Sequence, residues 1–422
     1  MQNYEPQLDM DTVAIDEVWN HGEGSHAKMH DVHAYPAKFP AFIAAKAFSY
    51  AKDEGVDVST VADVFCGCGT VALEAKLQGI DFWGCDINPV AALIARAKSQ
   101  NYSILKITNY YAAIQHAIEQ QAGAILDYDN APDRIKYWFD EEMYRKLFRI
   151  KNAIDLVIPL NSKYRTAFYC IFSSCLKATS NWLTKSIKPQ VDPEKEPEDA
   201  YSIFTHQYER FKKAAMTLPE CDTSDIRIIK GNFLKMNKVP DVDLIVTSPP
   251  YVTSYEYADL HQLSTLWLGY VEDYRDLRKG TIGSIYNSNQ INMSDDSVNT
   301  AGRAIINKLV EVARETAKTK SVARYFTDIQ KVVKRSYEIL NDEGMVLFIV
   351  GDTEYKGVRI ENSKHILQSM ADSGFSEIKL GKRKISGKIL TPYRNEKGHF
   401  SSEETGTNIY HEEFVISGRK KC

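Results

Sequence analysis

The sequence has few of the features that mark secreted or membrane proteins. Its seven cysteines show no regular spacing, so we expect free thiols in a reducing compartment rather than a disulfide framework. No apolar run approaches the length needed to span a bilayer, and residues 1–20 are too acidic and polar for a signal peptide. These absences predict a cytoplasmic protein with no membrane partner.

An excess of positive charge and a metal-ligand pattern are also missing. The chain has 52 Lys and Arg residues against 56 Asp and Glu residues, a net charge of −4. Contacts with nucleic-acid phosphates would therefore need a local basic patch, for which residues 308–324 and 379–394 are candidates, although solvated surface explains both more simply. His26, His30 and His33 have no cysteine or carboxylate partner at ligand spacing, so no metal site is predicted.

The chain alternates between strand and helix patterns near its start. Residues 58–65 and 80–86 are short apolar runs that predict buried parallel strands. Helices are expected at residues 71–77 and 89–98, the second of them capped by Asn88. Later elements are expected as strands at 226–230, 243–247, 345–350 and 412–417 and as helices at 323–340 and 364–372. This order predicts an α/β protein with a doubly wound, Rossmann-like sheet.

Residues 100–225 interrupt this alternation. Their patterns are mainly helical, at residues 140–157, 164–182 and 199–216. We interpret them as an inserted helical subdomain, so that the main domain consists of residues 31–99 and 226–420. A second insertion is predicted at residues 252–322, and residues 1–30 are expected to be a polar lead-in.

A glycine-rich turn follows the first expected strand. Residues 63–70 have the sequence Asp-Val-Phe-Cys-Gly-Cys-Gly-Thr, in which Gly67 and Gly69 allow a tight turn and a close backbone approach to a ligand. Neither the dinucleotide pattern G-x-G-x-x-G nor the lysine of a triphosphate-binding loop is present. Asp86 lies 23 residues after Asp63, a spacing at which a carboxylate can accept both hydroxyls of a ribose. A plain strand–turn–helix junction is the alternative.

A proline-rich motif follows the fourth expected strand, at the end where open α/β sheets bind ligands. Residues 247–251 are Thr-Ser-Pro-Pro-Tyr. Pro249 and Pro250 fix the backbone and remove two N–H donors, which leaves rigid carbonyl acceptors beside the Ser248 hydroxyl. These acceptors can hold an exocyclic amino group by its hydrogens, while Tyr251 offers a flat face on which a planar base can stack. A proline turn that only ends a strand is the alternative.

With both motifs in this order, the sequence resembles the S-adenosylmethionine-dependent DNA amino-methyltransferases. These enzymes make N4-methylcytosine or N6-methyladenine, usually in restriction–modification systems. Residues 63–70 match their cofactor motif D-x-F-x-G-x-G-T, and residues 248–251 match their catalytic motif (D/N/S)-P-P-(Y/F/W). Serine in the first position is typical of the cytosine-N4 enzymes and aspartate of the adenine-N6 enzymes. The resemblance covers roughly residues 33–98, 226–270 and 323–418.

The resemblance implies roles for individual residues. Ser248, Pro249, Pro250 and Tyr251 would be catalytic, orienting the amino group of a flipped base for in-line attack on the sulfonium methyl. In the binding site for S-adenosyl-L-methionine, Asp86 would hold the ribose, and Asn232 and Phe233 would sit at the adenine. The remaining cofactor-binding residues would be Tyr35, Lys38, Phe39, Asp63, Phe65, Cys66, Gly67, Gly69, Thr70 and Ile87.

The expected activity is therefore site-specific methylation of double-stranded DNA at the exocyclic N4 of cytosine, and a cognate restriction endonuclease is left open as a partner. Carbon-5 methylation is disfavoured because it needs a cysteine nucleophile. In the family of carbon-5 methyltransferases this cysteine follows a proline, and the chain has no Pro-Cys pair. Three alternatives stay open: adenine-N6 methylation, amino-methylation of RNA or protein, and a non-catalytic DNA-binding subunit. Either insertion could contact DNA, and polar residues between positions 280 and 303 suit base edges.

Overall fold

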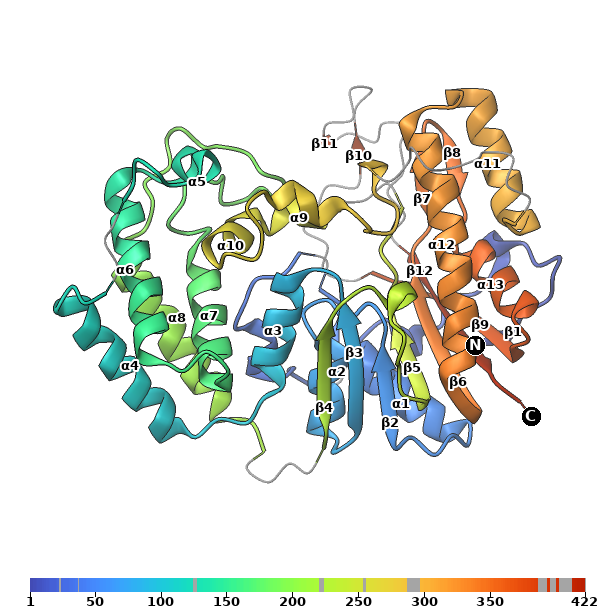
Figure 1. Cartoon of the computed structure of the whole chain (residues 1–422). Coiled ribbons are helices and arrows are strands. Elements are labelled where there is room, and N and C mark those ends of the chain that lie inside the picture. Colours follow the sequence, from blue (N-terminus) through green and yellow to red (C-terminus); the bar gives the residue numbers. More distant parts are fainter. Residues whose placement is uncertain are drawn as a thin grey trace.

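The computed structural model places a large sheet beside a group of helices (Figure 1). It describes the chain except residues 23, 37, 124–126, 220–223, 253–255, 287–296, 386–392, 395–399, 402–411 and 422, and it describes only the backbone of residues 393, 394, 400 and 401. The main sheet has eight strands in the order β1-β9-β12-β6-β5-β2-β3-β4. Within the described residues, no helix is both long and apolar enough to cross a membrane.

The parallel part of the sheet is built from the predicted strands. Its members are β2 (Thr60–Asp63), β3 (Asp81–Asp86), β4 (Ile226–Lys230), β5 (Val242–Thr247) and β6 (Leu340–Val350). Each neighbouring pair among them is parallel. Counted along the chain, their spatial order is third, second, first, fourth, fifth, which is the order of a doubly wound sheet. The predicted α/β fold class is therefore confirmed.

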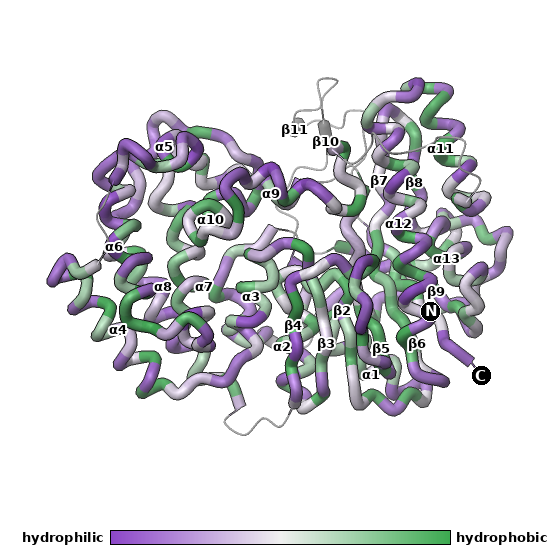
Figure 2. Tube along the Cα trace, viewed as in Figure 1, coloured by the Kyte–Doolittle hydropathy of each residue, from purple (hydrophilic) through white to green (hydrophobic). Residues whose placement is uncertain are grey.

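The two faces of the sheet bury alternate side chains of the same strands. On β5, Leu244 and Val246 pack with α1 (Ala41–Asp53) and α2 (Thr70–Leu77), whereas Ile245 joins the core on the other face. This alternation is what a period of two residues demands of a strand buried on both faces. Figure 2 shows hydrophobic residues along these central strands. The helices on the second face are α11 (Thr300–Ala313), α12 (Ala317–Ile339) and α13 (Asn362–Asp372).

The antiparallel edge of the sheet corrects two predictions. β9 (Ser376–Lys384) lies between β12 (Glu412–Arg419) and β1 (Gln2–Asn3) and is antiparallel to both. The candidate basic patch at residues 379–394 is therefore wrong at Lys382 and Arg383, which are only 5% and 1% exposed on this strand. Lys388 lies outside the described residues, as does the side chain of Arg394.

The expected polar lead-in at residues 1–30 is also wrong. β1 adds a strand to the sheet edge, and Met10 and Trp19 are each only 2% exposed. These apolar side chains are too widely spaced to form a periodic pattern, so the sequence carried no strand or helix signal there. The segment contributes to the core through contacts with parts of the chain that are distant in sequence.

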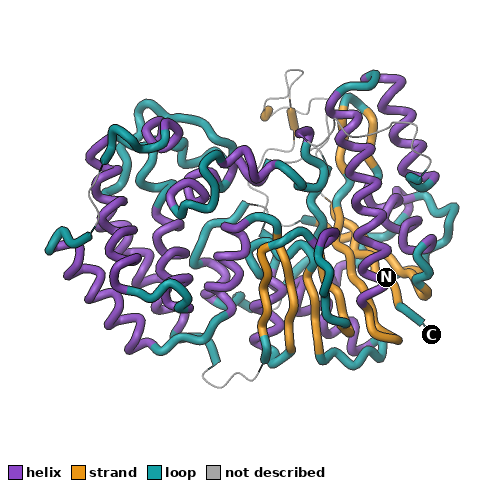
Figure 3. Tube along the Cα trace, viewed as in Figure 1, coloured by secondary structure: helices purple, strands orange, loops and turns teal. Residues whose placement is uncertain are grey.

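Residues 100–218 form the group of helices at one side of the sheet (Figures 1 and 3). Their shared core contains Leu147, Phe168 and Tyr208, and the rings of Tyr111 and Tyr208 stack with centroids 3.6 Å apart. α3 (Pro89–Ser99), whose cap is Asn88 as predicted, joins this core to the sheet. The helices are α4 (Ile104–Glu119), α5 (Asp133–Trp138), α6 (Glu141–Val157), α7 (Lys163–Cys175) and α8 (Ala200–Ala215).

Several helices differ from the sequence expectation. α7 ends at Cys175, so the helix expected at residues 164–182 is too long, and α4 was not expected. Residues 252–322, the predicted second insertion, contain α11 and the start of α12, and also α9 (Tyr257–Leu260) and α10 (Gln262–Trp267). Residues 287–296, part of the polar stretch between positions 280 and 303, lie outside the described residues. Smaller elements are β7 (Thr353–Tyr355), β8 (Val358–Ile360), β10 (Tyr393–Arg394), β11 (Phe400–Ser401), η1 (Met10–Thr12), η2 (Glu17–Trp19), η3 (Lys28–Asp31), η4 (Phe233–Lys235) and η5 (Tyr274–Arg278).

Candidate functional site

The two sequence motifs meet at the carboxyl edge of the parallel strands. The glycine turn follows β2, and residues 248–251 follow the adjacent β5. Asp86 ends β3 on the other side of β2, and Asn232 follows β4. Because all four strands are parallel, their carboxyl ends lie on one edge, about 5 Å apart from strand to strand. β2 and β5 also bound the point where the strand order reverses, which is where such sheets bind ligands.

The glycine turn adopts a backbone that only glycine accepts readily. Gly67 and Gly69 have φ angles of +50° and +74°. A Cβ atom on Gly69 would lie 2.7 Å from the Ala95 Cβ, whereas one on Gly67 would meet nothing closer than the Tyr35 hydroxyl at 3.7 Å. Gly69 is thus needed for packing against α3, whereas a Cβ atom on Gly67 would only reach ordinary van der Waals contact with Tyr35.

Gly69→Ala is expected to lower the free energy of unfolding by about 1–3 kcal/mol more than Gly55→Ala does, because overpacking against Ala95 adds to the backbone strain. Gly55 is a matched control, since its φ is +84° and a Cβ atom there would meet nothing within 4 Å. Urea denaturation of both variants measures the difference. Equal losses of stability would contradict the close approach of Gly69 to α3.

The Asp86 carboxylate is held by the backbone around it. Its Oδ2 accepts a hydrogen bond from the Gly67 amide at 2.9 Å, and its Oδ1 accepts one from the Asn88 amide at 2.8 Å. Desolvation raises the pKa of Asp86 to about 6, against the lowering effect of these two bonds. Each carboxylate oxygen can accept a further hydrogen bond. The side chain therefore faces the glycine turn with acceptor capacity to spare.

A buried hydrogen bond joins the two motifs directly. The Thr247 hydroxyl donates to Asp63 Oδ1 at 2.6 Å, and that oxygen also accepts the Phe65 amide at 3.0 Å. Burial raises the pKa of Asp63 to about 7. Asp63 and Thr247 are 184 residues apart in sequence, so this bond sets the position of the proline motif relative to the glycine turn. Sequence spacing could not have revealed it.

The Tyr35 side chain lies beside the glycine turn. Its ring stacks on the His261 ring with centroids 5.0 Å apart, and His261 Nδ1 is 2.8 Å from Asn88 Nδ2. Burial lowers the pKa of His261 to about 3, so the ring is neutral. His261 therefore connects α10's start to the cap of α3. The sequence did not single out His261, because only the fold brings residues so far apart together.

The other predicted cofactor residues lie at different depths. Cys66, Thr70 and Phe233 are buried, and the Phe233 ring packs near Trp83 with centroids 6.4 Å apart. Asn232 caps η4 and also donates to the Gly280 carbonyl at 3.3 Å. Lys38 Nζ donates to the His30 carbonyl and to Asp31, both at 3.1 Å. The half-exposed residues at the edge are Tyr35, Phe39, Phe65, Gly67, Asp86, Ile87, Asn232, Ser248, Pro250 and Tyr251.

Tyr251 is anchored by residues that the sequence did not indicate. Its hydroxyl donates to Glu413 Oε1 on β12 at 2.9 Å. Its ring lies against Gly351, where a Cβ atom would approach Tyr251 Cε2 to 3.2 Å. Glu413 is 162 residues from Tyr251, and no local pattern marks it as a site residue.

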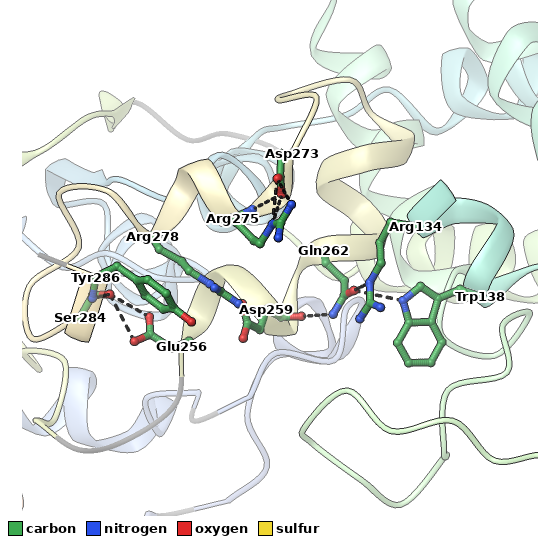
Figure 4. Close-up of polar contacts among 10 residues, drawn as sticks. All are labelled: Arg134, Trp138, Glu256, Asp259, Gln262, Asp273, Arg275, Arg278, Ser284 and Tyr286. Carbon is green, nitrogen blue, oxygen red and sulfur yellow. Dashed lines mark hydrogen bonds and ion pairs between the residues drawn. The ribbon is translucent and has the colours of Figure 1, made fainter. Parts of the chain in front are cut away.

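A polar network ties the segment after the proline motif to the helical group (Figure 4). Gln262 Oε1 accepts from Arg134 Nε at 2.6 Å and from Trp138 Nε1 at 3.0 Å. Gln262 Nε2 donates to the Asp259 carbonyl at 2.8 Å, and the Asp259 carboxylate pairs with Arg278 at 2.7 Å. An adjoining cavity of about 480 Å³ is lined by Pro132, Asp133, Arg134, Tyr137, Leu266, Glu272, Asp273, Tyr274 and Arg275. None of these residues belongs to the predicted site.

The predicted absence of a metal site concerned His26, His30 and His33. His30 Nε2 is 2.7 Å from Glu74 Oε1, and His33 Nε2 is 2.8 Å from Ser173 Oγ. In the part of the chain that the structure describes, no group of three or more His, Cys, Asp or Glu side chains could hold a metal ion. The described cysteines are free and buried: Cys66, Cys68, Cys85, Cys170 and Cys175.

Comparison with known proteins gives matches that agree with these motifs. Residues 2–97, which include the glycine turn and Asp86, match the family model described as DNA methylase. The chain is 23% identical over 372 residues to the type II methyltransferase M.MvaI of Kocuria varians, covering 78% of each protein. It is 21% identical over 381 residues to the type II methyltransferase M.BsoBI of Geobacillus stearothermophilus, covering 76% of this chain and 74% of the relative.

Among solved structures, two matches have low TM-scores. TehB from Haemophilus influenzae gives a TM-score of 0.28 at 10% identity, covering 89% of this chain and 62% of that one. The rRNA methyltransferase aviRa from Streptomyces viridochromogenes gives a TM-score of 0.27 at 11% identity, covering 99% and 96%.

Proposed function

We propose that this chain, a DNA methyltransferase whose cofactor is S-adenosyl-L-methionine, transfers the methyl group to the exocyclic N4 of cytosine. The observation that carries the proposal is the position of residues 248–251 at the end of β5, next to the glycine turn after β2. A donor bound at that turn faces a target held by the proline motif. Serine at position 248 favours cytosine, and adenine N6 is the second candidate.

The proposed cofactor site uses the open edge above the glycine turn. Gly67 has no side chain there, and a Cβ atom would first meet Tyr35 at 3.7 Å, so a ligand can approach the turn closely. Asp86 offers acceptor capacity for the two ribose hydroxyls, and Asn232 lies at the end of the neighbouring β4. Asn232, Asp86 and Gly67 lie at the ends of three neighbouring strands, in this order across the sheet. They fit a nucleoside that extends toward Tyr35 and Tyr251. The bound cofactor supplies an electrophilic methyl group.

The protein's own residues then position the acceptor. We propose that the target base leaves the duplex, at a cost of a few kcal/mol, and stacks on Tyr251. The Ser248 hydroxyl and the Pro249 carbonyl accept hydrogen bonds from the amino group and direct its lone pair at the methyl carbon. Attack proceeds in line without a covalent enzyme intermediate, and positioning supplies much of the rate.

Cofactor binding is expected to weaken at acidic pH. The pKa of Asp86 is about 6, so below that pH the carboxyl group becomes protonated and loses acceptor capacity for ribose hydroxyls. Affinity for S-adenosylhomocysteine should fall about tenfold between pH 7.5 and pH 5, as expected for one proton taken up. Isothermal titration measures this fall.

Asp86→Asn should bind more weakly at pH 7.5 and lose most of the pH dependence. Asp57→Asn is the control, because Asp57 is exposed and lies before β2 rather than at the site. If Asp86→Asn kept the pH dependence of the wild type, Asp86 would not be the group that binds the ribose.

We further propose that the DNA lies across the helical group and residues 252–322, and that the catalytic domain comprises residues 31–99 and 226–420. In Figure 1, α5, α9 and α10 lie toward the same end of the molecule as the carboxyl ends of the parallel strands. Two type II relatives support a role in restriction–modification, with a cognate endonuclease as the proposed partner.

One experiment tests the proposed function. The protein is incubated with radiolabelled S-adenosylmethionine and unmethylated bacterial DNA, and the digested nucleosides are separated. Labelled N4-methylcytosine is the expected product. Labelled N6-methyladenine would instead establish the second candidate, and transfer to RNA or protein but not to DNA would overturn both.

A further inference from the structure

Amino-group methylation creates a proton that must leave the active site. When the nitrogen forms its bond to the methyl carbon, the electron pair of the sulfur–carbon bond stays on sulfur and the nitrogen becomes cationic. One N–H proton must then be passed to an acceptor. Serine, unlike the aspartate of related motifs, is not a base near neutral pH, so residue 248 cannot keep this proton. The structure offers an acceptor further along a hydrogen-bonded chain.

The hydrogen-bonded chain begins at Ser248 and ends at Glu413 on β12. The Ser248 hydroxyl lies within reach of the Tyr251 oxygen, and hydrogen bonding between the two side chains lowers the pKa of Tyr251 against the larger raising effect of burial. The Tyr251 hydroxyl donates in turn to Glu413 Oε1 at 2.9 Å. With Ser248 as the donor to the Tyr251 oxygen, each hydroxyl donates toward Glu413 and keeps an acceptor position on its other side. The Ser248 oxygen can then accept a hydrogen bond from the target amino group.

Tyr251 has the protonation state that such a chain requires. Burial, followed by the nearby Glu413 carboxylate, raises the pKa of Tyr251 well above its ordinary value. The phenol therefore stays neutral at working pH and can both donate and accept. Gly351 leaves room for its ring, since a Cβ atom there would lie 3.2 Å from Tyr251 Cε2.

Glu413 is held in place from its other side. It lies directly opposite Arg383 in the antiparallel β12–β9 pair, and Arg383 Nη1 pairs with Glu413 Oε2. Arg383 Nε also donates to the Trp19 carbonyl at 3.0 Å. The Arg383 side chain is only 2% exposed, so the fold buries a cation beside one oxygen of Glu413 and leaves the other oxygen for Tyr251.

We propose that Glu413 is the terminal proton acceptor for methyl transfer, reached through Ser248 and Tyr251. The inference rests on the proposed amino-methyl transfer. The amino nitrogen gives its proton to the Ser248 oxygen, the Ser248 proton moves to Tyr251, and the Tyr251 proton moves to Glu413. Both hydroxyls end with the proton count that they began with, and the Glu413 carboxyl group later releases its proton to water.

Other titratable groups near the Ser248–Tyr251–Glu413 hydrogen-bonded chain have their own partners among the described residues. Lys382 pairs with Glu412 at 3.7 Å, and Asp352 after β6 pairs with Arg359 at 3.0 Å. Tyr257 interacts with Tyr251 electrostatically and raises its pKa slightly further. Glu413 is therefore the carboxylate in direct contact with Tyr251.

The test compares single-turnover methylation by the wild type, Glu413→Gln, Tyr251→Phe and the double variant. Glu413→Gln keeps an acceptor oxygen for Tyr251 but takes up no proton, and a loss of at least about tenfold is expected. The double variant should be no slower than the slower single variant. Glu412→Gln is the matched control, because Glu412 is the neighbouring residue on the same strand and pairs with Lys382.

A pH profile separates proton acceptance from mere support of the fold. With S-adenosylmethionine saturating at each pH, so that protonation of Asp86 does not limit the rate, the wild-type rate should fall on the acid side. Glu413→Gln should lose that fall while binding S-adenosylhomocysteine and DNA as the wild type does at each pH. A Glu413→Gln rate within about twofold of the wild type, or an unchanged acid-side dependence, would overturn the inference. Analysis of the wild-type product comes first: a methylated amino group on either base leaves the relay open to this test, whereas no transfer to any amino group rejects both the proposed function and the relay.

Discussion

The Ser248→Ala, Tyr251→Ala double variant is expected to lose methyl transfer by about a thousandfold or more, because positioning of the amino group supplies most of the rate. In the proposed site, Ser248 accepts a hydrogen bond from that amino group and Tyr251 stacks on the base, and the Tyr251 hydroxyl donates to Glu413. Cofactor binding should change little, since these residues follow β5 whereas the glycine turn follows β2. Single-turnover transfer and titration with S-adenosylhomocysteine measure the two quantities.

Ser49→Ala serves as a control for substitution in general. Ser49 is exposed on α1 and donates only to the Ala45 carbonyl of its own helix at 3.3 Å. It should retain wild-type transfer. Retained transfer in the Ser248→Ala, Tyr251→Ala variant would refute the proposed catalytic roles, and lost cofactor binding would show that the two motifs do not act separately.

Gln262→Ala is expected to lower the free energy of unfolding by about 4 kcal/mol, because it leaves buried donors without their acceptor and opens a cavity. Gln262 is fully buried and accepts hydrogen bonds from both Arg134 and Trp138 (Figure 4). These bonds join α5 of the helical group to α10, which follows the proline motif. Denaturant unfolding gives the stability, and DNA binding of the variant reports whether the two parts still act together.

Gln78→Ala is the matched control for this change. Gln78 is exposed at the end of α2, so its replacement should change stability by less than about 0.5 kcal/mol. If Gln262→Ala were as stable as Gln78→Ala, the network would not join the helical group to the catalytic segment. If its stability fell but DNA binding were unchanged, the helical group would not contact DNA.

The strands and motifs of the parallel sheet were predictable because their causes are local. A β-branched run followed by glycines specifies β2 and its turn, and Gly67 and Gly69 do adopt positive φ angles. Asn88 caps α3 through a hydrogen bond to the Val90 amide, as its residue type indicates. In each case the signal and its structural effect lie within a few residues of one another.

The antiparallel edge was not predictable in the same way. Lys379, Lys382 and Arg383 look like a basic surface in the sequence, yet Lys379 pairs with Glu54 and Arg383 pairs with Glu413. Charge composition cannot distinguish a solvated surface from a strand whose charged side chains form ion pairs with residues brought next to it by the fold. Residues 1–30 were expected to be a lead-in because their apolar side chains form no periodic pattern, although Trp19 is almost fully buried.

The sequence by itself determined which motif follows which strand, and which chemical groups each motif offers. It could do so because the local signals of strands, glycine turns and prolines act over a few residues. The tertiary structure decided how these motifs face one another. Thr247 bonds to Asp63 across 184 residues, Tyr251 bonds to Glu413 across 162, and Asn88 lies beside His261 across 173. These contacts depend on which strands become neighbours, and the pairing of strands is set by the burial of the whole sheet rather than by any one segment.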